Sequence, residues 1–254
     1  EKISSSNGFD PVIVGEDNIA VVTVQDGPSL EHGDVIAPTV GEGSRPGDKT
    51  FHNGFQDIEA FLNAGGRRGN QEQVLTEGTY YINRLFATIE MAKKTVVPIG
   101  FVGVVNSFTG HIVDDSNHDD TAVASVVPVG SRGIWDKPLR PGKYAYNPFA
   151  YNIAMVPTTN FQLRWVKSEG ESKDYDANLS EIKLITRDAF EPILPLTLVV
   201  KISPADAPKV IQQFSDVTKL VNETLDPMVS AWFKDSAQAQ TLLEVVTRRA
   251  ELQK

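Results

Sequence analysis

The chain has 254 residues, of which 41% are hydrophobic, and its 33 acidic and 24 basic side chains give a net charge of −9. This length suits one large domain or two modest ones, and the apolar fraction is sufficient for a packed core. The acidic balance repels phosphates, so nucleic acid is not an expected partner, and a sequence without cysteine excludes disulfides, thiolate metal sites and cysteine nucleophiles.

The first predicted element is a strand at 18–24, a β-branched run that ends at the turn sequence Asp26-Gly27-Pro28. Residues 28–65 follow as a glycine-rich insert. Within this insert, 56–63 is predicted to form a short amphipathic helix that stops at Gly65-Gly66. The first part of the chain is therefore expected to combine a strand, a variable loop and one helix.

Residues 66–91 are repeated without a gap at 130–155, at a shift of 64 positions. Nine of the 26 aligned residues are identical, where ordinary residue frequencies give about one or two. In the first copy the identical positions are Gly66, Arg68, Gly69, Leu75, Gly78, Tyr80, Asn83, Ile89 and Met91. We interpret this match as an internal duplication, in which each copy forms a turn, a strand, a corner and a second strand.

The duplication extends upstream of these residues. Residues 102–110 resemble 19–27, since both read as a strand followed by a glycine turn, but the spacing to the rest of the copy differs. The inserts at 28–65 and 111–129 account for the difference. Gly78 and Gly142 are expected at equivalent turn positions, and the tyrosines two residues after each glycine are expected to point to equivalent places.

The residues after the second copy change from strands to helices. Strands are predicted at 161–166, 182–185 and 196–203, and helices at 205–214 and from Asp216 onward. Pro227 is expected to bend the second of these helices, and Ser236 is expected to cap a third. This third helix has apolar positions at Leu242, Val246 and Ala250, and no terminator.

An apolar stripe runs along the helix that Asp216 begins. Its members recur at spacings of three and four, namely Val217, Leu220, Val221, Leu225, Met228, Val229 and Trp232. Such a stripe either binds a partner or covers the protein's own sheet. We assign it to the core, which predicts that Val221, Leu225 and Trp232 are buried.

Strands followed by helices indicate an α+β fold: a duplicated β-rich module with mixed or antiparallel sheets, then C-terminal helices packed on the second sheet. The predicted domains are an N-terminal β-rich module at 1–94, a second domain at 95–235 and the start of a C-terminal helix or coiled coil at 236–254.

Four patterns suggest chemistry, and each has a simpler structural interpretation. The acidic run Asp114–Asp120 has carboxylates that calcium prefers, but its spacing is not that of an EF-hand, so a solvated hairpin tip is expected. The glycine-rich segment Gly41–Gly47 lacks the phosphate-loop pattern. The histidines lack zinc-ligand spacing; they are His32, His52, His111 and His118. The tyrosines resemble a stacking platform but repeat with the module, so packing explains them better; they are Tyr80, Tyr81, Tyr144, Tyr146 and Tyr151. We therefore predict no catalytic, cofactor-binding or metal-binding residues.

Residues 95–254 resemble the SPFH superfamily, also called band-seven, which includes stomatins, prohibitins and flotillins. Val96–Val105 is similar to the family's opening strand, and Leu139–Tyr144 with Asn147-Pro148 to its L-x-P-G corner. Thr186–Phe190 is similar to its T-K-D-G stretch, although Arg187 and Ala189 replace the usual lysine and glycine. The strand at 196–203 and the helix that contains Pro227 follow in the family's order.

This resemblance implies a curved mixed sheet packed by helices, in proteins that sit on membranes and assemble into rings or cages. It implies a non-catalytic scaffold for lipids and partner proteins, among them membrane proteases or channels, and carries over no catalytic residues. We expect self-association through segments beyond Lys254 and a membrane anchor upstream of Glu1. One alternative is a ligand-binding protein or enzyme with a pocket between the two copies. Another is a shell-like or vault-like structural particle.

Overall fold

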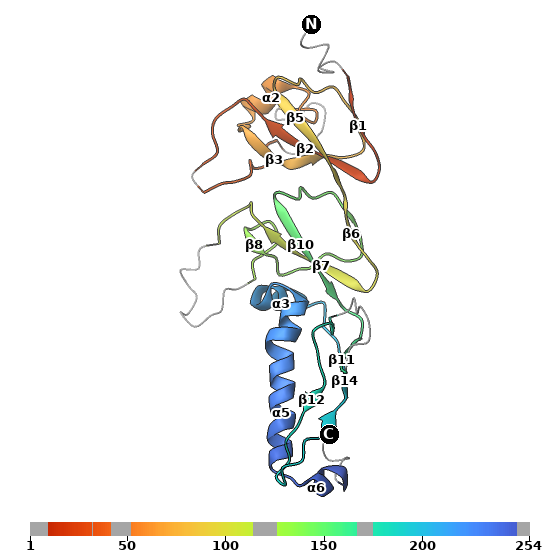
Figure 1. The fold of residues 1–254 in the computed structure, drawn as a ribbon. Helices are drawn as coiled ribbons and strands as arrows, with labels where there is room; N and C mark the ends of the chain where they lie inside the picture. The colour runs from red at the N-terminus through yellow and green to blue at the C-terminus, as the bar shows by residue number, and fades with distance from the viewer. Residues whose placement is uncertain (1–9, 32, 42–51, 114–125, 167–174, 248–254) are drawn as a thin grey trace. The chain divides into compact units, whose positions relative to one another are not determined.

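The computed structural model describes residues 10–31, 33–41, 52–113, 126–166 and 175–247 (Figure 1). The chain divides into two compact units, 1–155 and 156–254. The described strands pair in antiparallel sheets, and the longest helices lie in the C-terminal unit. The fold is therefore α+β, as the sequence predicts.

The first repeat is built on a three-stranded sheet with a short strand pair beside it. The sheet has the order β3-β2-β5, and β1 pairs with β4. Helix α2 begins after Asp57, whose carboxylate accepts a hydrogen bond from the Ala60 N–H and so caps the helix. The elements are β1 (Val12–Val14), β2 (Asn18–Val24), α2 (Ile58–Asn63), β3 (Gly69–Leu75), β4 (Gly78–Tyr80) and β5 (Ala87–Lys93).

The second repeat has the same plan, with a sheet in the order β10-β7-β8 and a pair of β6 with β9. The elements are β6 (Thr95–Val97), β7 (Phe101–Ser107), β8 (Gly133–Ile134), β9 (Gly142–Tyr144) and β10 (Tyr151–Pro157). Within this first unit, Figure 1 shows the sheets of the two repeats stacked one on the other.

The pairing registers of the two repeats are equivalent. Val14 pairs with Gly78 in the first repeat, and Val97 pairs with Gly142 in the second. The register of the central strands agrees too. Ala20 pairs with Leu75, and Gly103 forms a bridge with Leu139. The prediction that 66–91 and 130–155 form the same turn–strand–corner–strand unit, with both glycines at equivalent positions, is confirmed.

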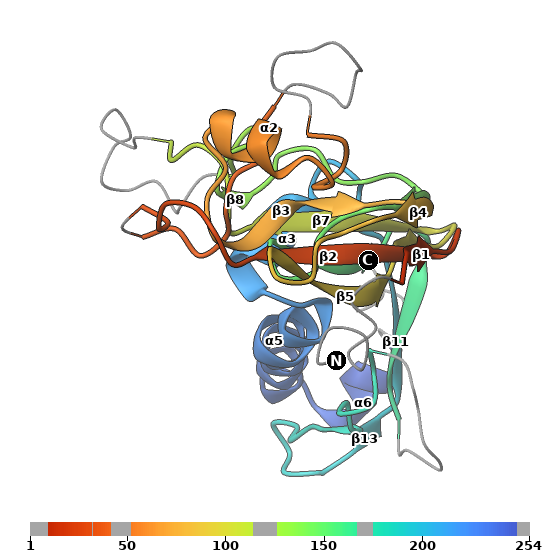
Figure 2. The ribbon, with the colours of Figure 1, turned by 90° about the horizontal axis from the view of Figure 1, so that it is seen from above.

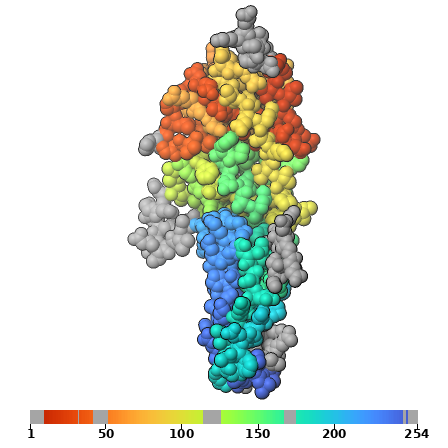
Figure 3. All heavy atoms as spheres, in the orientation of Figure 1, coloured from red at the N-terminus to blue at the C-terminus, as the bar shows by residue number. Residues whose placement is uncertain are grey.

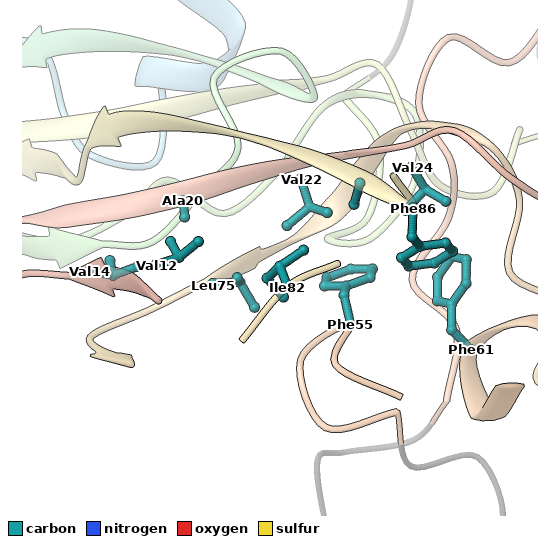
Figure 4. Close-up of a cluster of buried hydrophobic side chains, with 11 residues drawn as sticks. Val12, Val14, Ala20, Val22, Val24, Phe55, Phe61, Leu75, Ile82 and Phe86 are labelled. Atoms are coloured by element: carbon teal, nitrogen blue, oxygen red, sulfur yellow. The ribbon is translucent and has the colours of Figure 1, made fainter. Parts of the chain in front are cut away.

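The core of the first repeat lies on one side of β2. Figure 4 shows its side chains directed toward one another from β1, β2 and the segments that cover them. The buried members are Val12, Val14, Ala20, Val22, Val24, Phe55, Phe61, Leu75, Ile82, Phe86 and Ala87. On the opposite side of β2, Ile19 and Val21 are buried as well. Because both sides of β2 are covered, its sequence is a continuous apolar run and does not alternate.

The C-terminal unit contains two strand pairs and a helical segment. Strand β11 pairs with β14, and β12 with β13. Figures 1 and 2 both show α5 alongside the strands of this unit. The elements are β11 (Phe161–Trp165), β12 (Ile182–Lys183), β13 (Ile193–Leu194), β14 (Leu196–Val200), α3 (Ala207–Phe214), α4 (Val217–Lys219), the π-helix η1 (Leu220–Leu225), α5 (Asp226–Gln238) and α6 (Leu242–Thr247).

The inward row of the helical segment follows a spacing of four. Val221 and Ala237 are buried in the core of this unit, and the three residues between them in the row are partly buried against it: Leu225, Val229 and Phe233. In a regular α-helix, a row spaced by four drifts around the axis by about 40° at each step. The π-helix η1 turns through a smaller angle per residue, because its bonds run from i to i+5, and so removes most of this drift between Val221 and Leu225.

The predicted burial of Trp232 is therefore wrong. Its side chain is 53% exposed, and that of Met228, one turn earlier, is 64% exposed. The prediction of a buried stripe is right for Val221 and partly right for Leu225. It assumed uniform α-helical geometry, whereas the π-helical turns before Pro227 rotate the later residues. Pro227 lies in the first turn of α5, where its missing N–H is accommodated.

The last described helix begins later than predicted. Helix α5 continues through Ser236 to Gln238, so Ser236 is not an N-cap. The helix ends there, and α6 begins after Thr241, whose hydroxyl and N–H both donate to the Glu244 carboxylate. Asp188 accepts a hydrogen bond from the Leu242 N–H. The Thr241 hydroxyl oxygen also accepts from the Glu244 N–H, and this bond with that from the Thr241 N–H to the Glu244 carboxylate forms a capping box, which explains the new start.

Ala189 has a left-handed backbone conformation, with φ of 62°. Replacing Ala189 by glycine is expected to raise the free energy of unfolding by about 0.5–1 kcal/mol, since the relieved strain exceeds the entropic cost of glycine. Ala231→Gly, at an exposed position inside α5, is the matched control and should lower it by about 1 kcal/mol. Urea unfolding measures both, and a loss of stability in Ala189→Gly would contradict the argument.

Candidate interaction site at the repeat junction

Only some of the residues that suggested chemistry in the sequence lie in the described part of the chain. The acidic run Asp114–Asp120 lies outside the described residues, as do His32 and His118. His52 is buried, where its Nδ1 accepts from the Phe55 N–H and its Nε2 lies 3.2 Å from Gln73 Oε1. Its ring also packs against Phe61, so its contacts are those of a core residue.

Two further observations concern ligands and membranes. Within the described ranges, no group of three or more histidine, aspartate or glutamate side chains is placed to hold a metal ion. Nor does any helix in the part of the chain that the structure describes have the length and apolarity to cross a membrane. Of the glycine-rich segment at 41–47, only Gly41 lies in the described part.

A hollow of about 610 Å³ opens on the first repeat. Its lining includes Ser29, Glu31 and Arg68. Its acidic groups are already paired, because Glu31 accepts from Arg67 and Asp34 from Arg132, whereas Arg68 donates to the Ser29 hydroxyl. The hollow is lined by residues of the first repeat, whereas the pocket hypothesis placed a site between the copies.

The contacts that join the two repeats begin at a corner present in both. In the first repeat the Asn83 side-chain oxygen accepts from the Leu85 N–H, and the Asn83 carbonyl accepts from the Phe86 N–H. In the second repeat Asn147 accepts from Phe149 and Ala150 in the same way. An asparagine side chain mimics a backbone turn in this manner, which explains why both copies have asparagine here.

Asn147 has a second role, because its amide reaches the first repeat. The side-chain Nδ2 donates to Asn70 Oδ1 at 2.8 Å and to the Gln71 carbonyl at 2.6 Å. The residue is fully buried. Both amide hydrogens and the side-chain oxygen are thus used, so Asn147 joins β3 of one repeat to the corner of the other.

A tyrosine–carboxylate pair lies beside this asparagine. The Tyr151 hydroxyl donates to Glu72, whose other oxygen accepts from the Thr39 N–H and hydroxyl. Burial raises the pKa of the Tyr151 hydroxyl, and the hydrogen bond to Glu72 raises it further. The neutral phenol is therefore the form that the folded junction favours.

Two ion pairs lie at the edges of the junction. Arg132 contacts Asp34 at 2.5 Å, and Lys143 contacts Asp17 at 2.5 Å. The bond to Lys143 lowers the pKa of Asp17, and the same bond raises the pKa of Lys143. The Lys143–Asp17 pair is exposed, and such pairs contribute little to stability. In both pairs the basic group comes from the second repeat and the acidic group from the first. Figure 3 shows the atoms of the two repeats in contact on the face drawn.

The tyrosines of the repeats serve as packing and turn residues, with one exception. The hydroxyl of Tyr80 donates to the Thr76 carbonyl and that of Tyr144 to the Arg140 carbonyl, which are equivalent bonds. Tyr146 and Tyr151 pack edge to face, with ring centroids 4.8 Å apart. Tyr81 differs, since it is 68% exposed.

Tyr151→Phe is expected to lower the free energy of unfolding by about 1–2 kcal/mol at neutral pH, because Glu72 loses its donor. The raised folded-state pKa means that this contribution is full below the ordinary tyrosine pKa of about 10 and is lost as the pH rises through the folded-state value. The difference between wild type and variant should therefore shrink above about pH 10. Urea unfolding of wild type and variant at neutral pH and above about pH 10 tests this, and an equal difference in unfolding free energy at the two pH values would contradict it.

Exposed apolar side chains mark a second surface, in the C-terminal unit. Met228 and Trp232 lie one turn apart on α5, and both are more than half exposed. The Trp232 ring packs edge to face on Phe233, which holds it against the helix. The sequence assigned this surface to the core, and the structure exposes it.

Comparisons with known proteins agree with the architecture of the second repeat and the C-terminal unit. The model of the SPFH domain / Band 7 family matches residues 95–254. No curated protein matches the chain. The matched segment covers more than half of the chain and includes the corner at Asn147, the strand pairs of the C-terminal unit and the helices that follow. The chain therefore belongs to the SPFH domain / Band 7 family.

Proposed function

We propose that this protein is a non-catalytic scaffold subunit that assembles into oligomers and organises membrane lipids or partner proteins. Family membership supports a membrane-associated scaffold role in general, since proteins of this family are generally scaffolds without catalysis. The finer proposal depends on one observation: the outer face of α5 presents Met228 and Trp232 to solvent.

An exposed tryptophan beside a methionine on a rigid helix is suited to binding another protein. Aromatic residues and methionine are enriched in the buried centres of protein interfaces. Leu243, in α6, is 73% exposed and adds a further apolar side chain in this unit. We therefore propose that α5 contributes to contacts between subunits, together with segments beyond Lys254.

The proposed partners are other copies of the chain, membrane lipids and a membrane protease or channel. We propose membrane attachment through a segment upstream of Glu1. We also propose that residues 1–94 form a module related to the family's β unit, ahead of a domain at 95–235 and a C-terminal helical region at 236–254. The equivalent strand registers of the two repeats support the first of these assignments.

The assembly proposal predicts that residues 1–254 are monomeric or weakly associated at micromolar concentration, because one short helical seam holds little association energy. The chain with its native flanks should form large oligomers on vesicles, measured by light scattering with and without lipid. Trp232→Lys should reduce the oligomer. Val199→Lys, at an apolar position of the same unit that is 57% exposed, should leave it unchanged.

The outcome also separates the alternatives. Assembly of the flanked chain without lipid would favour a shell-like particle, for which the head-to-tail junction between the repeats is the supporting observation. A flanked chain that stays monomeric both with and without vesicles would contradict the scaffold proposal and favour a function based on the hollow of the first repeat.

A further inference from the structure

The junction between the two repeats joins two different faces of the same module. The first repeat contributes Asn70, Glu72 and Asp34, whereas the second contributes its corner asparagine and Arg132. Because the two joined faces differ, the junction is heterologous, and each repeat has its own equivalent of the face that the other repeat contributes. The first repeat therefore carries its own version of the face with which the second repeat binds it.

By equivalence with Arg132 and Asn147, we assign to this outer face Arg68 and Asn83, together with the corner residues beside Asn83, which are Tyr81, Arg84 and Leu85. Asn83 is equivalent to the fully buried Asn147 but is itself exposed. Its side-chain oxygen makes the corner bond, and nothing in the described part of the chain accepts from its Nδ2. The free amide is the same group that, in Asn147, donates to the neighbouring repeat.

Two other features of the outer face indicate what it binds. Tyr81 and Leu85, on either side of Asn83, are 68% and 79% exposed. The Nε of Arg84 is buried and lacks a hydrogen-bond partner among the described residues. Arg68 is equivalent to Arg132, which pairs with Asp34 at the natural junction. The face is thus apolar at its centre and basic around it.

We infer that the outer face of the first repeat binds a further β repeat of the same kind, carried by a partner chain. The occupant presents a carbonyl and an amide oxygen to Asn83, as Gln71 and Asn70 do to Asn147. It presents an acidic side chain, in the place of Asp34, to Arg68. This inference goes beyond the proposed scaffold function, because it concerns a different surface from α5 and does not depend on membrane attachment.

The test attaches a copy of the first repeat covalently to the chain, so that the occupant is defined. The two natural repeats join directly, since β5 ends at Lys93 and β6 begins at Thr95. A copy of residues 12–94 placed directly before Val12 of the full chain reproduces this connection. Hydrogen exchange at the natural Tyr81–Phe86 corner should slow at least about tenfold on addition of the copy, because docking protects exposed backbone.

Asn83→Asp in the natural first repeat is the decisive variant. It retains the oxygen that bonds to the Leu85 N–H but removes the donor that the occupant needs, so the corner folds and the protection is lost. Asp34→Lys in the added copy should have the same effect through repulsion of Arg68. Asn83→Asp in the chain without the added copy is the control, and it should leave the exchange of this corner unchanged.

Three results would overturn the inference. An added copy that is folded but leaves the corner unprotected shows that the face does not fit a repeat. An added copy whose own amides exchange as fast as those of an unfolded chain would show that the face does not stabilise a further repeat. Equal protection in tandem chains with and without Asn83→Asp would also exclude the role of Asn83.

Discussion

Replacing Asn147 by aspartate should cost about 3–5 kcal/mol of unfolding free energy, the range found when a buried charge is left without a partner. Asn147 is fully buried, and its Nδ2 donates to two oxygens of the first repeat, those of Asn70 and Gln71. A carboxylate in its place presents negative charge to both oxygens. The loss should become smaller at acidic pH, because protonation of the new carboxyl restores one donor.

The control for this experiment is contained in the first repeat. Asn83 makes the same corner bond but is exposed, so Asn83→Asp should change stability by less than about 0.5 kcal/mol. Urea unfolding of both variants separates the junction contribution from that of the corner. Equal losses in the two variants would mean that the corner, and not the junction, is what the asparagine stabilises.

Gly110→Ala is expected to have a comparably large effect, a loss of about 3 kcal/mol or more, from backbone strain together with overpacking. Gly110 has φ of 105°, and a Cβ there would lie 2.2 Å from the Gly130 carbonyl oxygen. A backbone oxygen cannot swing aside as a flexible side chain does. The turn at the end of β7 would therefore have to separate from residues 130–131.

Gly130→Ala is the matched control for the steric argument. Gly130 also has positive φ, 93°, but a Cβ there meets no atom of the described residues within 4 Å. This variant should lose about 1–2 kcal/mol, the cost of the conformation alone. Chemical unfolding of the two variants compares them directly. A Gly110→Ala loss no larger than that of Gly130→Ala would show that the turn relaxes freely.

The repeated strands were predictable because the residues that recur in the two copies are those that the turns and corners require. Gly78 and Gly142 begin equivalent strands, and Asn83 and Asn147 make equivalent corners. The role of Asn147 at the junction was not predictable from these recurring residues. Asn83 has the same local signature and is exposed, so only the stacking of the sheets distinguishes the two.

The error at Trp232 has a different origin. Periodicity arguments assume one angle per residue along a helix, and η1 departs from that angle between Leu220 and Leu225. The one signal in the sequence was Pro227, which was expected to bend the helix. The structure accommodates the proline next to a π-helical segment, and the residues after it face a direction that the α-helical period does not predict.

The π-helical turns also affect how the helix tolerates changes in length. The inward row from Val221 to Ala237 depends on the extra residue that η1 accommodates. A single-residue deletion within η1 would remove that extra residue and convert these turns to ordinary α-helix, so the later side chains would keep nearly their present directions. A single-residue deletion within the regular helix α5 would instead rotate every later side chain by about 100°. A one-codon deletion should therefore be tolerated better in η1 than in α5, where it would reassign the surface and the core of the rest of the helix.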